Sequence, residues 1–120
     1  MSRRTGFSPD VKDAVEERAG WRCELCANTH SDMEYHHRRA RGMGSTKRPE
    51  TNAAANCIYL CGSCHRHVES HRTQAYDNGW LVRQSAFPAD TPVLRRGVLV
   101  LLRDNGDIIP APPVRLEAVQ

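Results

Sequence analysis

Residues 56–65 read NCIYLCGSCH, and this stretch decides the fold because an apolar run leads directly into a Cys-x-x-Cys turn. The run predicts a buried strand that ends at Cys61, and the residues beyond it predict a helix from about 62 to 77. A second Cys-x-x-Cys turn lies upstream, from Cys23 to Cys26. The two turns together predict that distant parts of the chain meet at one metal ion.

The four cysteines Cys23, Cys26, Cys61 and Cys64 have the spacing of a structural zinc site. Zn²⁺ takes four ligands in a tetrahedron and favours thiolates, and each Cys-x-x-Cys turn presents two sulfurs to one point. Four thiolates leave no position for water, so this zinc would support folding rather than catalysis. Two local redox pairs, or simply buried cysteines, are the alternative interpretation. Cys57 lies in the apolar run and is expected to be a small core residue.

Three histidines lie next to or between the two cysteine pairs, which together we call the zinc knuckle. His36 and His37 lie between its two halves, within YHHR at 35–38, and His65 directly follows Cys64. A zinc ion that joins the two halves therefore also brings the histidine pair towards the helix that carries His65. We expect the three imidazoles to face one small cavity.

With YHH at 35–37, NCIYLC at 56–61 and CGSCH at 61–65, the sequence resembles the HNH endonucleases, also called ββα-metal or His-Me finger nucleases. The resemblance covers about residues 21–72 and includes all four cysteines of the knuckle. It implies an α+β fold: a ββα-metal (HNH) core with a structural zinc knuckle, an N-terminal helix and a C-terminal β-hairpin. Within the family, the chain is similar to small, free-standing members of the phage type.

The resemblance also implies roles for individual residues. His37 is expected to act as the general base that activates water, and Asn56 to pin the loop so that His37 is correctly aimed. His36 and His65 are expected to bind a catalytic divalent ion, which is Mg²⁺, Mn²⁺ or another. A histidine can take a proton near neutral pH, and a cation can stabilise the charge on a phosphodiester under attack. The expected products carry 5′-phosphate and 3′-hydroxyl ends.

One position departs from the family pattern. Many members carry a further histidine four residues after the first one on the helix, and Glu69 stands there in this chain. Glu69 shares a helical face with His65, and a carboxylate can bind a hard metal ion. Either Glu69 or His71 is expected to supply the third ligand of the catalytic ion. His67 and His71 are otherwise expected to be exposed on the helix near DNA, and His30 to belong to a turn.

The charge pattern fits a nucleic-acid partner. The 120 residues carry a formal net charge of +3 with all six histidines neutral. Basic residues gather in the loop after the histidine pair and on the predicted helix, where they could contact DNA phosphates. A solvated loop that keeps the protein in solution explains the loop charges equally well. The candidate nucleic-acid-binding residues are Arg38, Arg39, Arg41, Lys47, Arg48, Arg66 and Arg72.

The flanks of the motif are expected to complete a single domain. Ser8 predicts the start of an N-terminal helix and Gly20 its end. Residues 80–84 and 97–103 predict the two strands of a C-terminal hairpin, and residues 104–107 predict a turn. The expected division is an N-terminal arm and helix over 1–20, the nuclease core over 21–78, and the β-hairpin extension and tail over 79–120.

No apolar run approaches the length of a membrane span, and the N-terminus lacks the apolar centre of a signal peptide. We therefore expect a cytoplasmic protein without a membrane partner, in the host cell if a phage encodes it, where thiols stay reduced. The segment Gly79-Trp80-Leu81-Val82 is similar to one in free-standing phage HNH proteins. Some of those proteins act beside the phage terminase in genome packaging.

These expectations combine into one predicted function: a metal-dependent endonuclease that hydrolyses DNA phosphodiester bonds. Low sequence specificity is expected because the chain has no evident base-reading module. Two other functions fit part of the pattern. A non-catalytic, zinc-dependent nucleic-acid-binding module would need only the cysteines and the basic loop. A scaffold that uses the C-terminal hairpin would show no salt-sensitive DNA binding.

Overall fold

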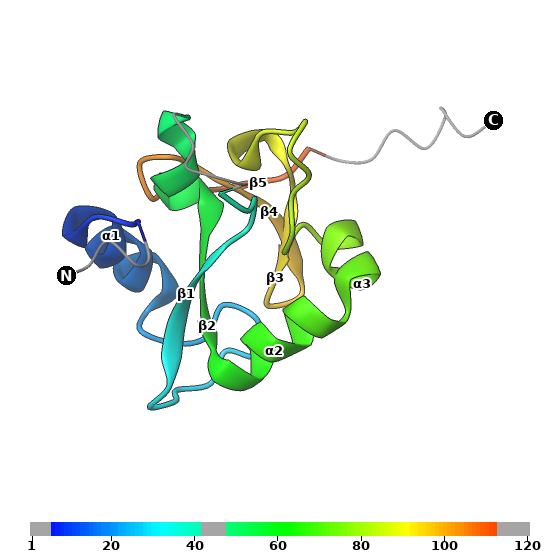
Figure 1. Ribbon diagram of the computed structural model, residues 1–120. Helices are drawn as coiled ribbons and strands as arrows, with labels where there is room; N and C mark the ends of the chain where they lie inside the picture. The colour runs from blue at the N-terminus through cyan, green and yellow to red at the C-terminus, as the bar shows by residue number, and fades with distance from the viewer. Residues whose placement is uncertain (1–5, 42–47, 113–120) are drawn as a thin grey trace.

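Short helices and short strands alternate over the residues that the structure describes, 6–41 and 48–112. In chain order, the elements are α1 (Pro9–Ala19), β1 (Met33–His37), η2 (Pro49–Asn52), η3 (Ala54–Asn56), β2 (Cys57–Cys61), α2 (Gly62–Ser70), α3 (Arg72–Asp77), η4 (Pro88–Asp90), β3 (Val93–Arg95), β4 (Val98–Leu102) and β5 (Ile108–Pro110). The computed structural model arranges the strands of these ranges in two small sheets with helices around them (Figure 1). The expected α+β class is therefore confirmed.

The first sheet is an antiparallel hairpin of β1 and β2, in which His37 lies opposite Cys57. Helix α2 begins directly after β2 and packs beside both strands (Figure 1). The Cys61 sulfur accepts a hydrogen bond from the Cys64 backbone N–H and so caps the first turn of α2. A Cβ atom on Gly62 would lie 2.4 Å from the Asp32 carboxylate, so α2 begins close to the segment that leads into β1.

Helix α1 lies on the other side of the hairpin from α2 (Figure 1). The Ser8 side chain accepts a hydrogen bond from the Val11 N–H, and Gly20 ends the helix with φ +66°. Both limits of the expected N-terminal helix are thus confirmed. The buried residues of α1, Val15 and Ala19, pack in one apolar cluster with Phe7, Ala54, Cys57 and Tyr59.

The expected single helix over 62–77 is wrong, because the backbone leaves the helical conformation at His71, with φ −121° and ψ 64°. The Ser70 hydroxyl donates back to the carbonyl oxygens of Arg66 and His67, a contact that competes with regular helix geometry. The chain then resumes as α3, which buries Ala75 in the core. The break therefore turns α3 towards the second sheet.

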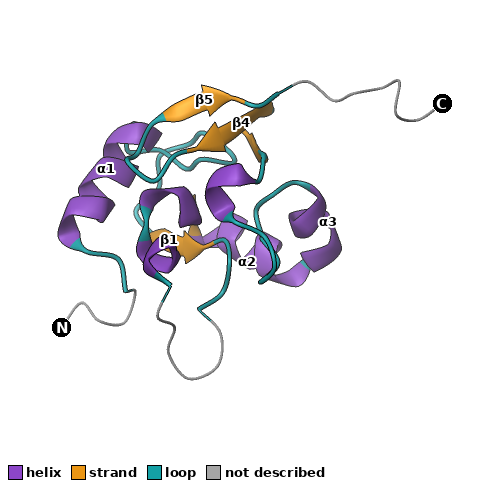
Figure 2. Cartoon of the chain, turned by 90° about the horizontal axis from the view of Figure 1, so that it is seen from above, coloured by secondary structure: helices purple, strands orange, loops and turns teal. Residues whose placement is uncertain are grey.

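The second sheet contains β3, β4 and β5 in that order, all antiparallel. A two-residue turn at Arg96-Gly97 joins β3 to β4, and both of its residues have positive φ. The predicted turn over 104–107 lies between β4 and β5, and the Arg103 N–H donates to the Asp107 carbonyl across it. Figure 2 shows β4 and β5 along one side of the molecule, with α1 and α3 at its two ends.

The predicted strand over 80–84 is absent, although residues 80–82 are buried. The Trp80 and Leu81 N–H groups donate to the Ala75 carbonyl, and the Val82 N–H donates to the Arg38 carbonyl. These contacts differ from a strand ladder because they bind the segment to α3 and to the loop after β1. Its place in the predicted hairpin is taken by β3.

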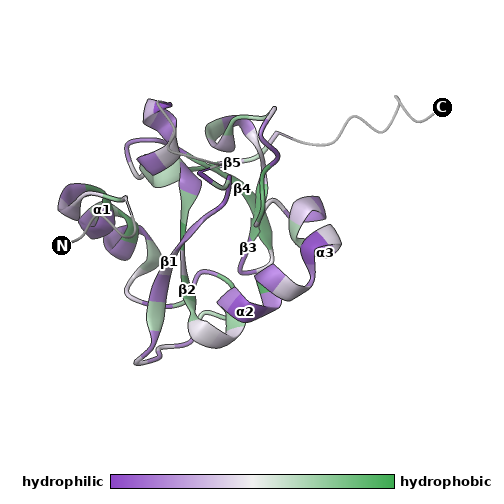
Figure 3. Ribbon diagram, in the orientation of Figure 1, coloured by the Kyte–Doolittle hydropathy of each residue, from purple (hydrophilic) through white to green (hydrophobic). Residues whose placement is uncertain are grey.

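The largest apolar cluster lies between the first hairpin, α2, α3 and the second sheet. Figure 3 shows the most hydrophobic stretches on β2, β3 and β4, while α2 and α3 carry mostly hydrophilic residues. All five residues of β2 are buried. The first hairpin is therefore held from both sides, which fixes the positions of the histidines at the end of β1.

Candidate metal centres and active site

The four cysteines of the two turns meet at one point. Their sulfur atoms all lie within 4.8 Å of one another, although Cys23 and Cys26 follow α1 while Cys61 and Cys64 flank the start of α2. Four thiolates at this spacing could hold a metal ion such as zinc. Cys57 lies outside this four-cysteine cluster and is fully buried, as expected of a core residue.

Backbone N–H groups point at the sulfur of Cys23 in the four-cysteine cluster. The Cys23 sulfur accepts hydrogen bonds from the N–H groups of Leu25 and Cys26, at 3.4 and 3.5 Å. Cys26 is exposed, and its sulfur lies 3.4 Å from Nε2 of His30. The sequence predicted only a turn at His30, and nothing in its spacing indicated this contact with a cysteine.

A second cluster of possible metal ligands lies between β1 and α2. His36 Nδ1 is 3.2 Å from His65 Nε2, and the Glu69 carboxylate is 3.6 Å from the first nitrogen and 3.7 Å from the second. Two ligands about 2.1 Å from one ion lie about 3.0 Å apart in octahedral geometry and about 3.4 Å apart in tetrahedral geometry. The three side chains therefore have a spacing that suits a common cation.

In each of the two rings, the nitrogen that points away from the other ring already has a hydrogen-bond partner. His36 Nε2 donates to the Trp80 carbonyl oxygen at 2.9 Å, and His65 Nδ1 donates to the Glu34 carboxylate at 2.5 Å. In a neutral imidazole, a proton on one nitrogen leaves a lone pair on the other. When both rings are neutral, the two nitrogens that face each other across 3.2 Å both present lone pairs, an arrangement that a shared cation stabilises.

Burial keeps His36 neutral. Its side chain is 3% exposed, and this desolvation lowers its pKa to about 4, although the bond to the Trp80 carbonyl opposes the shift. The ring therefore carries no proton on Nδ1 at ordinary pH, as a metal ligand requires.

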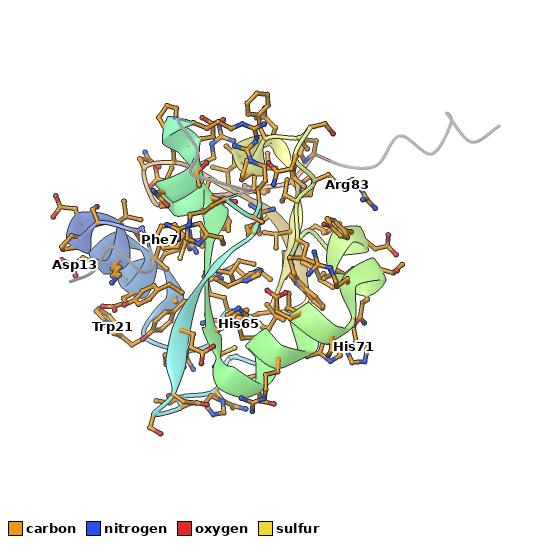
Figure 4. The ribbon with its side chains drawn as sticks, in the orientation of Figure 1. Phe7, Asp13, Trp21, His65, His71 and Arg83 are labelled. Carbon is orange, nitrogen blue, oxygen red and sulfur yellow. The ribbon has the colours of Figure 1, made fainter. Side chains whose placement is uncertain are left out.

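Glu69, rather than His71, shares the cluster with the two histidines. His71 instead stacks on His67, with ring centroids 4.1 Å apart, and its Nδ1 lies 3.1 Å from the His67 carbonyl. Figure 4 shows His65 on the side of α2 that faces the hairpin and His71 at the far end of the helix. The distances thus favour Glu69 between the two candidates for the third ligand.

His37 lies at the end of β1 and lines the same pocket as the His36, His65 and Glu69 side chains. Its Nε2 donates to Oδ1 of Asn52 at 2.9 Å, which leaves Nδ1 free to accept a proton. Burial lowers the pKa of His37, as does the positive charge of Arg41, and the bond to Asn52 opposes the shift. The ring is therefore neutral at ordinary pH.

The pocket has a volume of about 330 Å³. It is open to solvent on one side, and its walls come from β1, from the loop after β1 and from α2. Its lining residues are Tyr35, His36, His37, Ala40, Arg41, His65 and Glu69. A neutral imidazole, three possible metal ligands and a guanidinium thus share one cavity large enough for a phosphate group.

Asn56 is completely buried and fastens the loop after β1. Its Oδ1 accepts from the Arg39 N–H at 2.7 Å, and its Nδ2 donates to the carbonyls of Arg39 and Thr51 at 3.0 and 2.8 Å. Asn56 therefore holds the backbone that follows His37, whereas the side chain that forms a hydrogen bond with the ring is that of Asn52. No pattern in the sequence singles out Asn52, because only tertiary structure brings η2 against β1.

The expectation that Arg38 contacts DNA is wrong, because its side chain is completely buried. Its guanidinium donates to backbone carbonyls at 2.8–3.0 Å, those of Ala55, Gly79, Pro88 and Thr91. A guanidinium carries five N–H donors, and inside a protein these must be satisfied by acceptors. Arg38 therefore ties the first hairpin to the C-terminal part of the chain.

The same expectation is wrong for Arg39, which is 1% exposed. Its guanidinium donates to the Ala86 carbonyl at 2.6 Å and to the Glu50 carboxylate at 3.0 Å. Four other predicted DNA contacts, Arg41, Arg48, Arg66 and Arg72, are exposed. Lys47 lies outside the described residues.

Comparisons with protein-family models, with curated proteins and with solved structures find no match to this chain. What the protein does must therefore be inferred from its own residues and their geometry. Across residues 6–41 and 48–112, no helix combines the length and the apolar character needed to cross a membrane.

Proposed function

We propose that the chain is a metal-dependent DNA endonuclease of the HNH type, with β1, β2 and α2 as its ββα-metal core. The observation that carries the proposal is the pocket in which His36, His65 and Glu69 lie beside His37. Water attacks a phosphodiester only when the phosphate charge is neutralised and a base removes the proton. The pocket offers groups for both tasks.

His37 is the general base of the proposed reaction. Its Nδ1 takes a proton from water as the water oxygen bonds to phosphorus. The Nε2–H group keeps its hydrogen bond to Asn52 throughout this step. The bond from phosphorus to the 3′ oxygen breaks, and that oxygen leaves with the bonding electrons and is protonated by solvent. The products carry 5′-phosphate and 3′-hydroxyl ends.

In this proposal His36, His65 and Glu69 would hold the catalytic ion, and the four-cysteine cluster would hold a separate structural zinc. A bound divalent ion would neutralise a non-bridging phosphate oxygen and the departing 3′ oxygen. Imidazole suits transition metals and carboxylate suits Mg²⁺ or Mn²⁺, so this mixed set of donors accepts several ions. Glu34 and the Trp80 carbonyl fix the two histidine rings in the tautomers that binding needs.

DNA is the proposed substrate because the described residues expose several cations, one of them in the pocket itself. Arg41 lines the pocket itself, and Arg48, Arg66 and Arg72 are also exposed. Contacts from guanidinium groups to phosphate position DNA but carry no sequence information directly. Low sequence specificity follows from this arrangement.

Relaxation of supercoiled plasmid in the presence of Mg²⁺, Mn²⁺ or Ni²⁺ tests the proposal. The wild-type protein is expected to nick the plasmid, and His37→Ala is expected to lower the rate by about 10²- to 10⁴-fold. His71→Ala is the matched control, because it removes an exposed imidazole that lies outside the pocket. Equal cutting by the wild type and His37→Ala would refute the mechanism.

Salt-sensitive DNA binding without cutting by any of the three ions would instead identify a non-catalytic nucleic-acid-binding module. The exposed arginines are sufficient for such a role. In that case the same His37→Ala substitution would leave the affinity for DNA unchanged, because the ring contributes no fixed charge.

A further inference from the structure

The ring of His37 is held along its edge by Asn52, the last residue of η2. The Nε2–Oδ1 distance of 2.9 Å is that of a full hydrogen bond. This contact selects the proton position on the ring and also limits its rotation about the Cβ–Cγ bond. Asn52 does not line the pocket, so its effect on any substrate passes through His37.

The face of the same ring is covered by Phe7, from the segment that precedes α1. The two rings are stacked, with centroids 4.1 Å apart and an interplanar angle of 17°. Phe7 is 1% exposed and belongs to the apolar cluster formed with α1 and β2. Figure 4 shows Phe7 between α1 and the hairpin.

The backbone conformation of Gly6 and its lack of a side chain allow the N-terminal segment to pack closely against the site. Its φ of +77° favours glycine, and a Cβ atom there would lie 2.8 Å from Oδ1 of Asn52 and 2.9 Å from Nη1 of Arg41. The Gly6 backbone is thus packed against the partner of His37 and against the exposed guanidinium of the pocket. Asn52 and Phe7, the two residues that contact the His37 ring, are therefore packed together through Gly6.

From this geometry we infer that Asn52 and Phe7 are positioning residues for His37, and that the N-terminal segment Gly6-Phe7 is part of the active site. The inference rests on the proposed function, in which His37 is the base. The edge contact fixes which nitrogen accepts the proton, and the stacked ring fixes the plane in which that nitrogen lies. Misplacement of a catalytic group by about 1 Å can lower a rate by about 10²-fold.

Asn52→Leu and Asn52→Asp separate positioning from packing. Both side chains are close in size to asparagine, but only aspartate keeps an acceptor for Nε2–H. Asn52→Leu is expected to lower kcat for plasmid nicking by about 10- to 100-fold with an unchanged KM. Asn52→Asp is expected to retain kcat within about threefold, because the ring keeps its tautomer and direction.

Phe7→Leu removes the stacked ring but keeps an apolar side chain in the cluster. It is expected to lower kcat by about tenfold. Val15→Ala is the control for Phe7→Leu, because Val15 is fully buried in the same cluster. This truncation is expected to destabilise the protein without touching the His37 ring. Loss of kcat in Val15→Ala equal to that in Phe7→Leu, at matched stability, would show that Phe7 acts only through packing.

A spectroscopic measurement tests the contact without any cutting. A hydrogen-bonded imidazole N–H exchanges slowly with water and gives a direct ¹H–¹⁵N signal, which His37→Ala assigns by its disappearance. We expect this signal in the wild type and in Asn52→Asp, and its loss in Asn52→Leu.

Wild-type nicking by Asn52→Leu, with His37→Ala inactive, would overturn the positioning role and leave the proposed function intact. If the wild type itself fails to nick DNA, the proposed function fails. The positioning inference then depends on the ring signal alone, and its absence from the wild type overturns it.

Discussion

Arg18 and Glu24 form an ion pair in the interior of the protein, with Nη2–Oε1 and Nε–Oε2 distances of 2.6 and 2.9 Å. The two side chains are 1% and 0% exposed. Glu24 also accepts from Arg95 at 2.7 Å and from the Tyr59 N–H at 3.0 Å. Burial alone would raise the pKa of Glu24, but the charge of Arg18 and the hydrogen bonds from Arg18, Arg95 and Tyr59 together outweigh burial and lower that pKa. The pair thus joins α1, the first cysteine turn, β2 and β3.

Glu24→Gln is expected to lower the free energy of unfolding by about 3–5 kcal/mol, because Arg18 would remain buried without its counter-charge. Urea denaturation followed by far-UV circular dichroism measures the change. Glu17→Gln, on the exposed face of α1, is the matched control and is expected to cost less than about 0.5 kcal/mol. Similar losses in the two variants would mean that the buried pair adds little to stability.

Cys61→Ser is expected to lose zinc and the folded structure together. Zinc binding contributes about 10–16 kcal/mol in zinc-finger peptides, which matches or exceeds the whole stability of about 5–15 kcal/mol of a small domain. Metal analysis and circular dichroism report the two losses. Cys57→Ala, a buried cysteine outside the cluster, is expected to keep one zinc ion per chain. A folded, zinc-free Cys61→Ser protein would contradict the structural role.

Arg38→Met is expected to destabilise the protein by about 2–6 kcal/mol, because the buried carbonyls of Ala55 and Gly79 lose their donor at about 1–3 kcal/mol each. Methionine keeps an apolar stem of similar length, so cavity formation contributes little. Thermal unfolding measures the effect. A melting temperature equal to that of the wild type would show that water satisfies the carbonyls.

Arg41→Ala is expected to leave stability unchanged and to weaken DNA binding. The slope of log affinity against log salt concentration should fall by about 1, which corresponds to one lost phosphate contact. Fluorescence anisotropy of labelled duplex DNA over a salt series measures this slope. An unchanged slope would show that Arg41 does not contact a DNA phosphate.

Glu34→Ala is expected to weaken binding of the catalytic ion by about 10- to 100-fold, because His65 loses the acceptor that fixes its tautomer. Calorimetric titration of the zinc-loaded protein with Mn²⁺ measures the affinity. Glu17→Ala is the control, since Glu17 is exposed on α1, away from the pocket. An affinity equal to that of the control would exclude a role for Glu34 at the metal.

Local features of the fold could be predicted from the sequence because they depend on neighbouring residues. The Ser8 cap, the Gly20 stop and the paired cysteines are of this kind. Spacing along a helix also placed Glu69 on the same face as His65, and the two do lie together. The break at His71 was missed because residue propensities alone do not show which turn the Ser70 hydroxyl will disturb.

Burial of charged groups could not be predicted. A run of arginines in a polar stretch indicates a solvated surface, and a chain seldom buries such groups without partners. Arg38 is buried because backbone carbonyls from three later segments converge on it, and that convergence exists only in the folded chain. Asn52 was missed for the same reason, since η2 meets His37 only after the hairpin has formed.

A fragment that ended at residue 78 would retain every expected metal ligand and would lose the Trp80 carbonyl. The buried ring of His36 would then be free to move its proton to the nitrogen that faces His65. With that proton facing His65, the proposed second ion site would be partly blocked even though every expected ligand remained in the chain. The segment after α3 carries none of the expected metal ligands, yet its Trp80 carbonyl directs the lone pair of His36 towards His65.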